Sequence, residues 1–318
     1  MSPTHKLASF RAPVAAALAR LAAVLAVVAL AVAAAPLPER WVHAPASHPA
    51  FIVRVTGQGQ PMILIPGLAS SGTTWTGTVA HFDHQYRCYV LTLAGFAGVA
   101  PISEPLLPTV RQELVAYIRR HHLVRPVIVG HSLGGSIALD LAARYPRLVG
   151  PVVIVDSLPF FAGAWFGAPN LAAAQPTIAR MRAGMDGMNH RQWLAYSRSG
   201  ASTRSLASKP ADQRRLVRWS LASDQRTVTD ALLALVSTDL RPELPRIQSR
   251  VLVLGTWIGL GHGITRAEAM QVFHQQYRGV RRLTFRMNDQ SRHFIMWDQP
   301  QWFYGQLARF LRAAPAQD

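Results

Sequence analysis

The alternation of apolar and polar positions along the chain predicts alternating strands and helices. Short runs of Val, Ile and Leu bounded by Gly, Pro or Asp are typical of strands. We expect strands at residues 51–55, 62–65, 86–93, 126–129, 149–155, 251–254 and 280–286. Apolar residues at helical spacing predict helices at 73–83, 107–122, 136–145, 266–277 and 301–312. The nearly continuous apolar run at 149–155 suits a central parallel strand covered by helices on both faces.

Two connections between strands determine the expected domain organisation. Residues 57–61 (GQGQP) are rich in turn-forming residues and predict a hairpin between the first two strands. Between residues 158 and 244 the strand pattern lapses into helical stretches rich in Ala, Met, Trp and Arg. We therefore expect a core made of residues 36–157 and 245–318, with a mainly helical cap inserted at 158–244.

The N-terminal segment differs from the rest of the chain. Lys6, Arg11 and Arg20 precede an almost unbroken apolar stretch at residues 21–35, and Ala31-Val32-Ala33 fits a cleavage site. This pattern predicts a signal peptide at residues 1–35, and hence export to the periplasm or secretion. Residues 11–35 are also long enough to remain as an uncleaved membrane anchor, so a membrane tether is the alternative.

Composition narrows the class of protein. A chain of 318 residues with 50% hydrophobic content can bury a full core. Its one cysteine, Cys88, allows no intrachain disulfide, and its place in an apolar run predicts a small buried residue. The net charge of +17 comes mostly from arginines scattered through helices, without a basic run interleaved with aromatics. We therefore expect no nucleic-acid partner, while loose attraction to an anionic surface stays open.

A candidate nucleophile lies where one predicted strand meets a predicted helix. Residues 126–135 (PVIVGHSLGG) carry an apolar strand directly into a Gly-x-Ser-x-Gly turn. A serine on so sharp a turn requires small residues two positions before and after it, and Gly130 and Gly134 meet that requirement. The motif alone is weak evidence, but its position between strand and helix is the one that a nucleophile elbow requires.

Three motifs together resemble the α/β-hydrolase family. They are the elbow, residues 63–72 (ILIPGLASSG) and residues 291–300 (SRHFIMWDQP), and they occur in the family's order across most of residues 51–313. The resemblance implies an α/β-hydrolase fold, with a mostly parallel sheet flanked by helices. It also implies roles for Ser132 as nucleophile and His293 as base, with the backbone amides of Leu68 and Leu133 forming an oxyanion hole.

The acid of the expected triad departs from the family pattern. Members usually place Asp or Glu just after the strand predicted at 251–254, and residues 255–262 (GTWIGLGH) contain neither. Some members take the acid from the end of the preceding sheet strand, where Asp156 stands. Asp156 therefore either orients His293 or caps the turn into the insertion. Of the other histidines, His131 is expected to pack beneath the elbow, and His262 is a candidate substrate contact.

These residues predict a serine hydrolase that cleaves a carboxylic ester through an acyl-Ser132 intermediate, with a small-molecule ester as substrate. No cofactor is implied, and no Cys and His cluster with metal-ligand spacing occurs in the sequence. Hydrolysis of an amide, a lactone or a carbon–carbon bond by the same apparatus is one alternative, because fold alone does not separate these reactions. A non-catalytic binding protein with a degenerate triad is the other.

Overall fold

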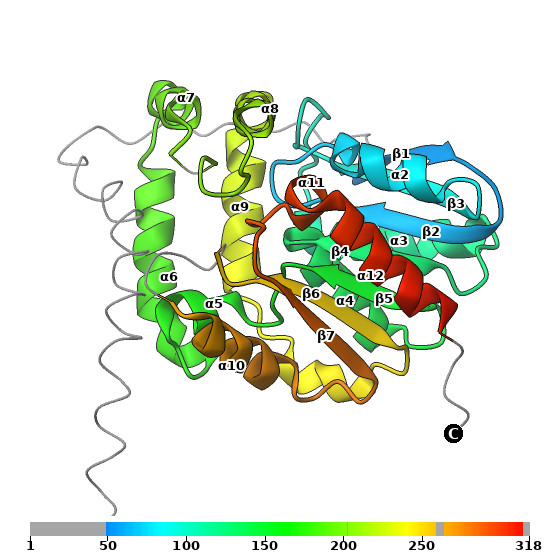
Figure 1. Ribbon diagram of the computed structural model, residues 1–318. Helices are drawn as coiled ribbons and strands as arrows, with labels where there is room; N and C mark the ends of the chain where they lie inside the picture. The colour runs from blue at the N-terminus through cyan, green and yellow to red at the C-terminus, as the bar shows by residue number, and fades with distance from the viewer. Residues whose placement is uncertain (1–48, 202, 259–263, 314–318) are drawn as a thin grey trace, which may run out of the picture.

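The computed structural model describes residues 49–201, 203–258 and 264–313. The expected export segment at residues 1–35 and the candidate contact His262 lie outside these residues. The strands are β1 (Phe51–Thr56), β2 (Gln60–Ile65), β3 (Tyr86–Leu93), β4 (Val127–His131), β5 (Val152–Val155), β6 (Val251–Thr256) and β7 (Leu283–Asn288). Figure 1 shows them as one twisted sheet with helices on both sides.

Short 3-10 helices and a series of α-helices accompany the sheet in the described ranges. The 3-10 helices are η2 (Gly72–Trp75) and η3 (Arg241–Arg246). The α-helices are α2 (Thr76–Phe82), α3 (Leu106–Arg120), α4 (Leu133–Arg144), α5 (Phe161–Phe166), α6 (Leu171–Asp186), α7 (His190–Ser199), α8 (Pro210–Leu221), α9 (Gln225–Val236), α10 (Arg266–Tyr277), α11 (Ile295–Asp298) and α12 (Pro300–Arg312). The single helix expected at 73–83 is thus divided between η2 and α2.

The sheet has the order β1-β3-β2-β4-β5-β6-β7. All neighbouring strands run parallel except β1, which pairs antiparallel with β3. This mostly parallel sheet confirms the expected fold class. The hairpin expected between the first two strands is wrong, because β1 crosses to the outer side of β3 and β2 lies between β3 and β4. Gly57 and Gly59 in the connection have φ of 85° and 92°, a left-handed backbone that redirects the chain between the two strands.

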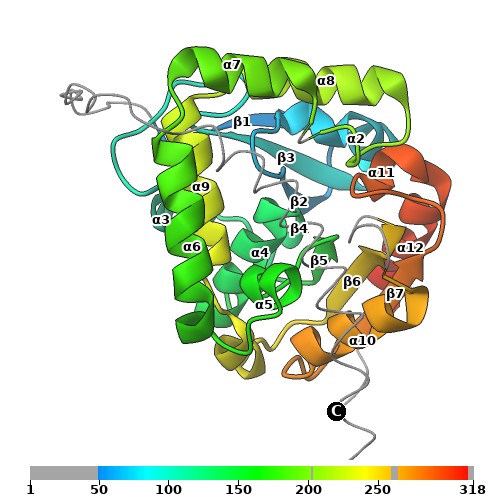
Figure 2. The same cartoon turned by 90° about the vertical axis from the view of Figure 1, so that its left-hand side faces the viewer.

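The inner strands β4, β5 and β6 and most of β2 are buried on both faces, which explains their apolar sequences. In β2, Met62 and Leu64 face a cluster that contains residues of α2 and α12. Ile63 and Ile65 face the opposite cluster, to which α3, α4, α9 and α10 contribute. Figure 2 shows these helices on the two sides of the sheet. The two packed faces fix the strand ends, and with them the residues of the candidate site.

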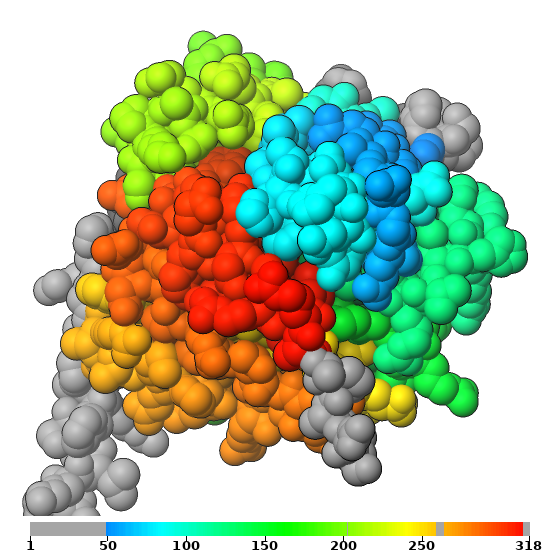
Figure 3. Space-filling view, turned by 45° about the vertical axis from the view of Figure 1, so that its right-hand side comes forward, coloured from blue at the N-terminus to red at the C-terminus, as the bar shows by residue number. Residues whose placement is uncertain are grey.

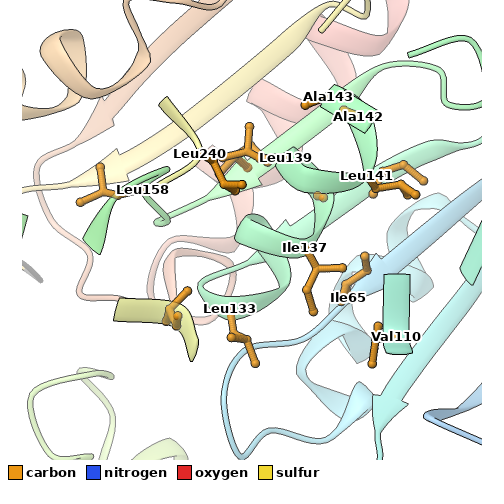
Figure 4. Close-up of a cluster of buried hydrophobic side chains, with 14 of the residues drawn as sticks. Ile65, Val110, Leu133, Ile137, Leu139, Leu141, Ala142, Ala143, Leu158 and Leu240 are labelled. Carbon is orange, nitrogen blue, oxygen red and sulfur yellow. The ribbon is translucent and has the colours of Figure 1, made fainter. Parts of the chain in front are cut away.

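Helix α4 lies in the larger of these two clusters, the one to which α3, α9 and α10 also contribute. Leu133, Ile137 and Leu141 are 4% exposed or less, and Figure 4 shows them beside Ile65 from β2 and Val110 from α3. Burial of a Leu or Ile side chain stabilises a fold by about 1.5–3 kcal/mol. The helix that follows Ser132 is therefore held rigidly against the sheet.

Helices α5 to α9 lie between β5 and β6, in the part of the sequence where the strand pattern lapses. We call them the helical insertion. Its α6 and α9 pack on each other, with Ala174, Ile178 and Ala231 buried in the larger cluster. Among the helices of the described ranges, none has both the length and the apolar character needed to cross a membrane.

Candidate active site

The sharp turn from β4 into α4 carries Ser132. This residue has φ 53° and ψ −118°, a conformation that L-residues rarely adopt. A Cβ atom on Gly130 would collide with the carbonyl oxygen of Gly134, and one on Gly134 would collide with that of Ile65. Both glycines are therefore required by close backbone contacts, as the sequence motif predicted.

The backbone of Ser132 is held by four hydrogen bonds. Its N–H donates to the carbonyl of Val155 at 3.0 Å, and its carbonyl accepts from the Ser157 hydroxyl at 2.7 Å and from the N–H groups of Gly135 and Ser136 at 2.8 and 3.2 Å. The buried hydroxyl of Tyr277 donates to the carbonyl of Ser157 at 2.8 Å, and burial raises the Tyr277 pKa well above its ordinary value. The phenol thus stays protonated, and its hydrogen bond holds Ser157, which in turn binds the Ser132 carbonyl.

His293 and Asp156 form a close pair. The His293 Nδ1 lies 2.6 Å from Asp156 Oδ2, and the second carboxylate oxygen accepts the N–H of Thr256 at 3.2 Å. An ionised carboxylate only accepts hydrogen bonds, so Nδ1 carries the proton and donates it. That tautomer leaves Nε2 with a free lone pair, which is the form that a general base requires.

Three parallel strands bring these residues to one edge of the sheet. Ser132 follows β4, Asp156 follows β5, and His293 follows β7 after a short loop. Because carboxyl ends of parallel strands share an edge, ligands commonly bind there. Ser132 is partly accessible, and within the described ranges no hydrogen bond occupies its hydroxyl. The hydroxyl is therefore available to a substrate and to a base.

The loop after β2 lies directly against the elbow. A Cβ atom on Gly67 would come within 3.3 Å of the Ser132 Cβ and within 3.0 Å of the His131 Nδ1. The next residue is Leu68, whose carbonyl accepts from the Ser70 hydroxyl at 3.1 Å. Leu133 is the first residue of α4, so its N–H has no partner within the helix. The two amides expected to bind an oxyanion thus belong to backbone segments that flank the serine.

His131 is buried beneath the turn and is not placed as a base. Its ring centroid lies 4.5 Å from that of His293 and 4.4 Å from that of Phe294. Its Nε2 lies 3.1 Å from the carbonyl oxygen of His293, to which it donates. Burial lowers the His131 pKa well below its ordinary value, and repulsion by His293 adds to this. The ring is therefore a neutral bridge between the elbow and the loop that carries His293.

Two residues of the site were missed by sequence reasoning. Thr256 is fully buried, and its hydroxyl donates to the carbonyl of Ser291 at 2.5 Å while its N–H binds Asp156. Ser157 holds the elbow carbonyl. Both are small hydroxyl residues at strand ends. Ser157 follows Asp156 directly, and Thr256 lies in the segment where the family usually places its acid; no other feature of the sequence indicated their roles.

Cys88 does not offer a rival nucleophile. It lies buried in β3, and burial raises its pKa to about 11, with a smaller contribution from Asp83. Because the thiolate is the reactive form of cysteine, a thiol with so high a pKa is inert at neutral pH.

Comparison with known proteins places the chain in a family. Residues 62–306 match the model of the Alpha/beta hydrolase family. A pimeloyl-[acyl-carrier protein] methyl ester esterase from Vibrio atlanticus is 29% identical over 63% of this chain and 76% of its own length. The protein of that name from Aeromonas hydrophila is 30% identical over 59% of this chain and 72% of its own length.

Solved structures agree on the fold. An esterase from Exiguobacterium antarcticum superposes with a TM-score of 0.68 at 15% identity, covering 83% of this chain and 96% of that protein. With the match over residues 62–306, the seven-stranded sheet and the elbow, these findings identify the chain as a hydrolase that belongs to the alpha/beta hydrolase family.

Proposed function

We propose that this chain is a serine hydrolase that cleaves a carboxylic ester, with Ser132 as nucleophile, His293 as base and Asp156 as the acid. The single observation that carries the proposal is the 2.6 Å pair between His293 Nδ1 and Asp156 Oδ2, at the same sheet edge as the strained Ser132. The names of the relatives support an ester rather than another acyl compound as the substrate.

The first half of the reaction forms an acyl-enzyme. The Ser132 Oγ attacks the carbonyl carbon of the ester, and its proton passes to Nε2 of His293. The carbonyl oxygen becomes an oxyanion, which the N–H groups of Leu68 and Leu133 stabilise. Removal of one such donor typically lowers kcat by about 10²–10³. The tetrahedral intermediate collapses as the carbon–oxygen bond of the ester breaks, and the alcohol leaves with the proton from His293.

The second half releases the acid. Water replaces the alcohol and gives a proton to His293, and the resulting hydroxide attacks the acyl carbon. Collapse of the second tetrahedral intermediate breaks the bond to Ser132, whose oxygen recovers the proton. Throughout, the Asp156 carboxylate accepts a hydrogen bond from Nδ1–H and stabilises the imidazolium without itself becoming protonated.

We propose that residues 158–244 act as the cap over this site. Contacts beside His293 support this role: the Arg292 guanidinium donates to the Arg204 carbonyl at 2.7 Å, and the Phe294 N–H donates to the Leu206 carbonyl at 3.1 Å. The insertion therefore touches the loop that carries the base on both sides of the histidine.

We also propose that residues 1–35 export the chain or tether it to a membrane. The basic flank, the apolar stretch and the cleavage pattern in the sequence support this proposal. Mass spectrometry of the mature N-terminus tests it: loss of about the first 33–35 residues indicates cleavage, and an intact N-terminus in the membrane fraction indicates an anchor. An intact N-terminus in the soluble fraction contradicts both.

Hydrolysis of p-nitrophenyl esters with graded acyl lengths tests the reaction. Wild type is expected to release nitrophenolate, and Ser132→Ala to lose about 10⁴-fold or more in kcat. Matched nitroanilides and lactones test the bond type. Faster turnover of the anilides or the lactones than of the esters would identify an amide or a lactone as the preferred substrate. Undiminished ester hydrolysis by a folded Ser132→Ala protein would remove Ser132 from the mechanism.

A further inference from the structure

The positive charge of the helical insertion is concentrated on α7 and α8. The whole chain has 33 basic and 16 acidic residues, about two to one. Residues 190–221 have seven basic residues and one acidic residue, Asp212. The seven are Arg191, Arg198, Arg204, Lys209, Arg214, Arg215 and Arg218. This segment is therefore more basic than the chain as a whole.

Four of these arginines lie on the outward faces of the two helices. Arg191 and Arg198 are seven residues apart on α7, and Arg214 and Arg218 are four apart on α8, so each pair shares a helix face. All four are exposed. We call them the outer arginines. The inward faces are buried at Trp193 and Ser197 on α7 and at Asp212, Leu216 and Ser220 on α8.

The two helices form one surface. The buried hydroxyls of Ser197 and Ser220 are joined by a 3.0 Å hydrogen bond, so α7 and α8 pack side by side. Figures 1 and 2 place both at one end of the molecule, and Figure 3 shows the yellow-green atoms of this region projecting at its upper corner. The outer arginines thus lie on the solvent-facing sides of one projecting pair of helices.

No carboxylate neutralises the outer arginines in the part of the chain that the structure describes. The one acid of this segment, Asp212, pairs with Arg215 at 3.3 Å, and Arg215 also lies over the Trp297 ring. Elsewhere, arginines such as Arg111 and Arg241 have carboxylate partners within 2.6 Å. The four guanidinium groups are therefore available to an external anion.

We infer that the outer arginines form a docking surface for a bilayer with anionic phosphate headgroups. Each Lys or Arg near such a surface strengthens binding several-fold, and the attraction extends over about a Debye length. Separate guanidinium groups on a projecting pair of helices can each contact a phosphate of a planar surface. The apolar stretch at residues 21–35, with its basic flank, would bring the same chain to a membrane during export or anchoring.

A single-stranded nucleic acid fits this surface less well. Single-stranded nucleic acids are bound by basic grooves lined with aromatic rings on which bases stack. Here Trp193 is buried, and Trp219 packs 5.7 Å from Trp297. The outward faces thus offer charge without an aromatic platform.

Vesicle binding by the full chain tests the inference. The readout is the ratio of partitioning into phosphatidylcholine vesicles that contain phosphatidylglycerol to partitioning into pure phosphatidylcholine vesicles. The ratio cancels insertion of the N-terminal apolar stretch, and the basic flank of that stretch is common to every variant, so differences between variants report on the replaced arginines. Wild type is expected to prefer the anionic vesicles by about tenfold or more at low salt, and the preference is expected to fall as salt rises.

Two variants with equal loss of charge separate the surface from the net charge. The first replaces the outer arginines with Gln, and the second makes the changes Arg54→Gln, Arg119→Gln, Arg120→Gln and Arg147→Gln, at exposed residues of other elements. The first variant is expected to lose about tenfold in the ratio, and the second to retain most of it. Unchanged hydrolysis of a soluble ester shows that both variants are folded.

Three results would overturn the inference. One is the absence of any preference for anionic vesicles in the wild type. Another is an equal loss in both variants, which would assign the effect to net charge. The third is binding of the outer arginines to duplex DNA without a preference for anionic vesicles, which would assign the surface to nucleic acid.

Discussion

At the residue scale, the site rests on two strained backbone positions that directly follow neighbouring strands. Ser132 has φ 53° and Asp156 has φ 45°, and such conformations cost about 1–3 kcal/mol in a non-glycine residue. Hydrogen bonds across the sheet offset the strain: the N–H of Ser132 binds the Val155 carbonyl at 3.0 Å, and that of Asp156 binds the Leu254 carbonyl at 2.7 Å. Residues held in this way keep their side chains at the sheet edge.

Replacement of Asp156 tests its role as the acid. Asp156→Asn is expected to lower kcat/KM for an aryl ester by about 10⁴-fold without unfolding the protein, because an amide favours the wrong tautomer of His293. Asp289→Asn is a matched control, since Asp289 is exposed and forms an ion pair at 2.7 Å with Arg266, away from His293. Near-normal turnover by Asp156→Asn, with intact circular dichroism, would leave Asp156 as a turn residue only.

The buried His131 predicts a pH dependence of stability. Its pKa in the folded protein is well below the value of about 6.5 expected when unfolded, so folding favours the neutral form. Its contribution is fully present above pH 6.5 and is lost as pH falls below 6.5 toward the folded-state pKa, by up to about 1.4 kcal/mol per pH unit. Urea unfolding between pH 8 and pH 5 measures this loss.

Two variants test whether this loss of stability at acid pH comes from the buried His131 ring. His131→Asn is expected to flatten the fall in unfolding free energy between pH 6.5 and pH 5, whatever its effect on stability at pH 8. His84→Asn changes an exposed histidine and leaves the buried one in place, so the fall should persist. An equally steep fall in His131→Asn would show that other groups produce the acid sensitivity.

At the element scale, the contact between the elbow and the loop after β2 determines the geometry of the site. Gly134 touches the carbonyls of Ile65 and Pro66, and Gly67 touches His131 and Ser132. These contacts hold the start of α4 against the segment that carries Leu68. The nucleophile and both proposed oxyanion donors thus depend on two glycines: Gly134 has no room for a side chain, and Gly67 has only tight contacts around it.

Two Gly→Ala substitutions with opposite expected signs test this packing. Gly134→Ala would drive a methyl group into backbone carbonyls, so it is expected to lower the free energy of unfolding by about 1–3 kcal/mol and to impair ester hydrolysis. Gly184→Ala, within α6, meets no atom within 4 Å and is expected to raise stability by up to about 1 kcal/mol. Denaturant unfolding measures both, and a neutral Gly134→Ala would contradict the close approach.

Element prediction from the sequence succeeded where packing on both faces produces a distinct pattern. The apolar strands β2, β4, β5 and β6 and the amphipathic α3 and α12 were predicted within a few residues. The pairing of β1 was not, because residues 57–61 suit a hairpin and also a crossover. Only the register of β1 with β3, from Phe51 opposite Leu93 to Thr56 opposite Cys88, decides between the two.

At the scale of the whole molecule, the sequence predicts the site residues that stand in short motifs better than those defined by contacts between distant segments. Ser132 and His293 stand in motifs of a few residues. Asp156 lies 137 residues from His293 in sequence, and nothing around it distinguishes an acid from a turn cap; the 2.6 Å pair is a product of the folded sheet. Thr256 was missed for the same reason, since its partners Asp156 and Ser291 are distant in sequence.

Covalent labelling with a fluorophosphonate tests the central claim most directly, because the reagent reacts with a serine that has been activated by a neighbouring base. The purified full chain and Ser132→Ala would be treated side by side, and the modified peptide mapped by mass spectrometry. We expect one adduct on Ser132 in the wild type and none in the variant. Well-folded wild-type protein that takes up no label, or carries it on another residue, would contradict the claim that Ser132 is an activated nucleophile.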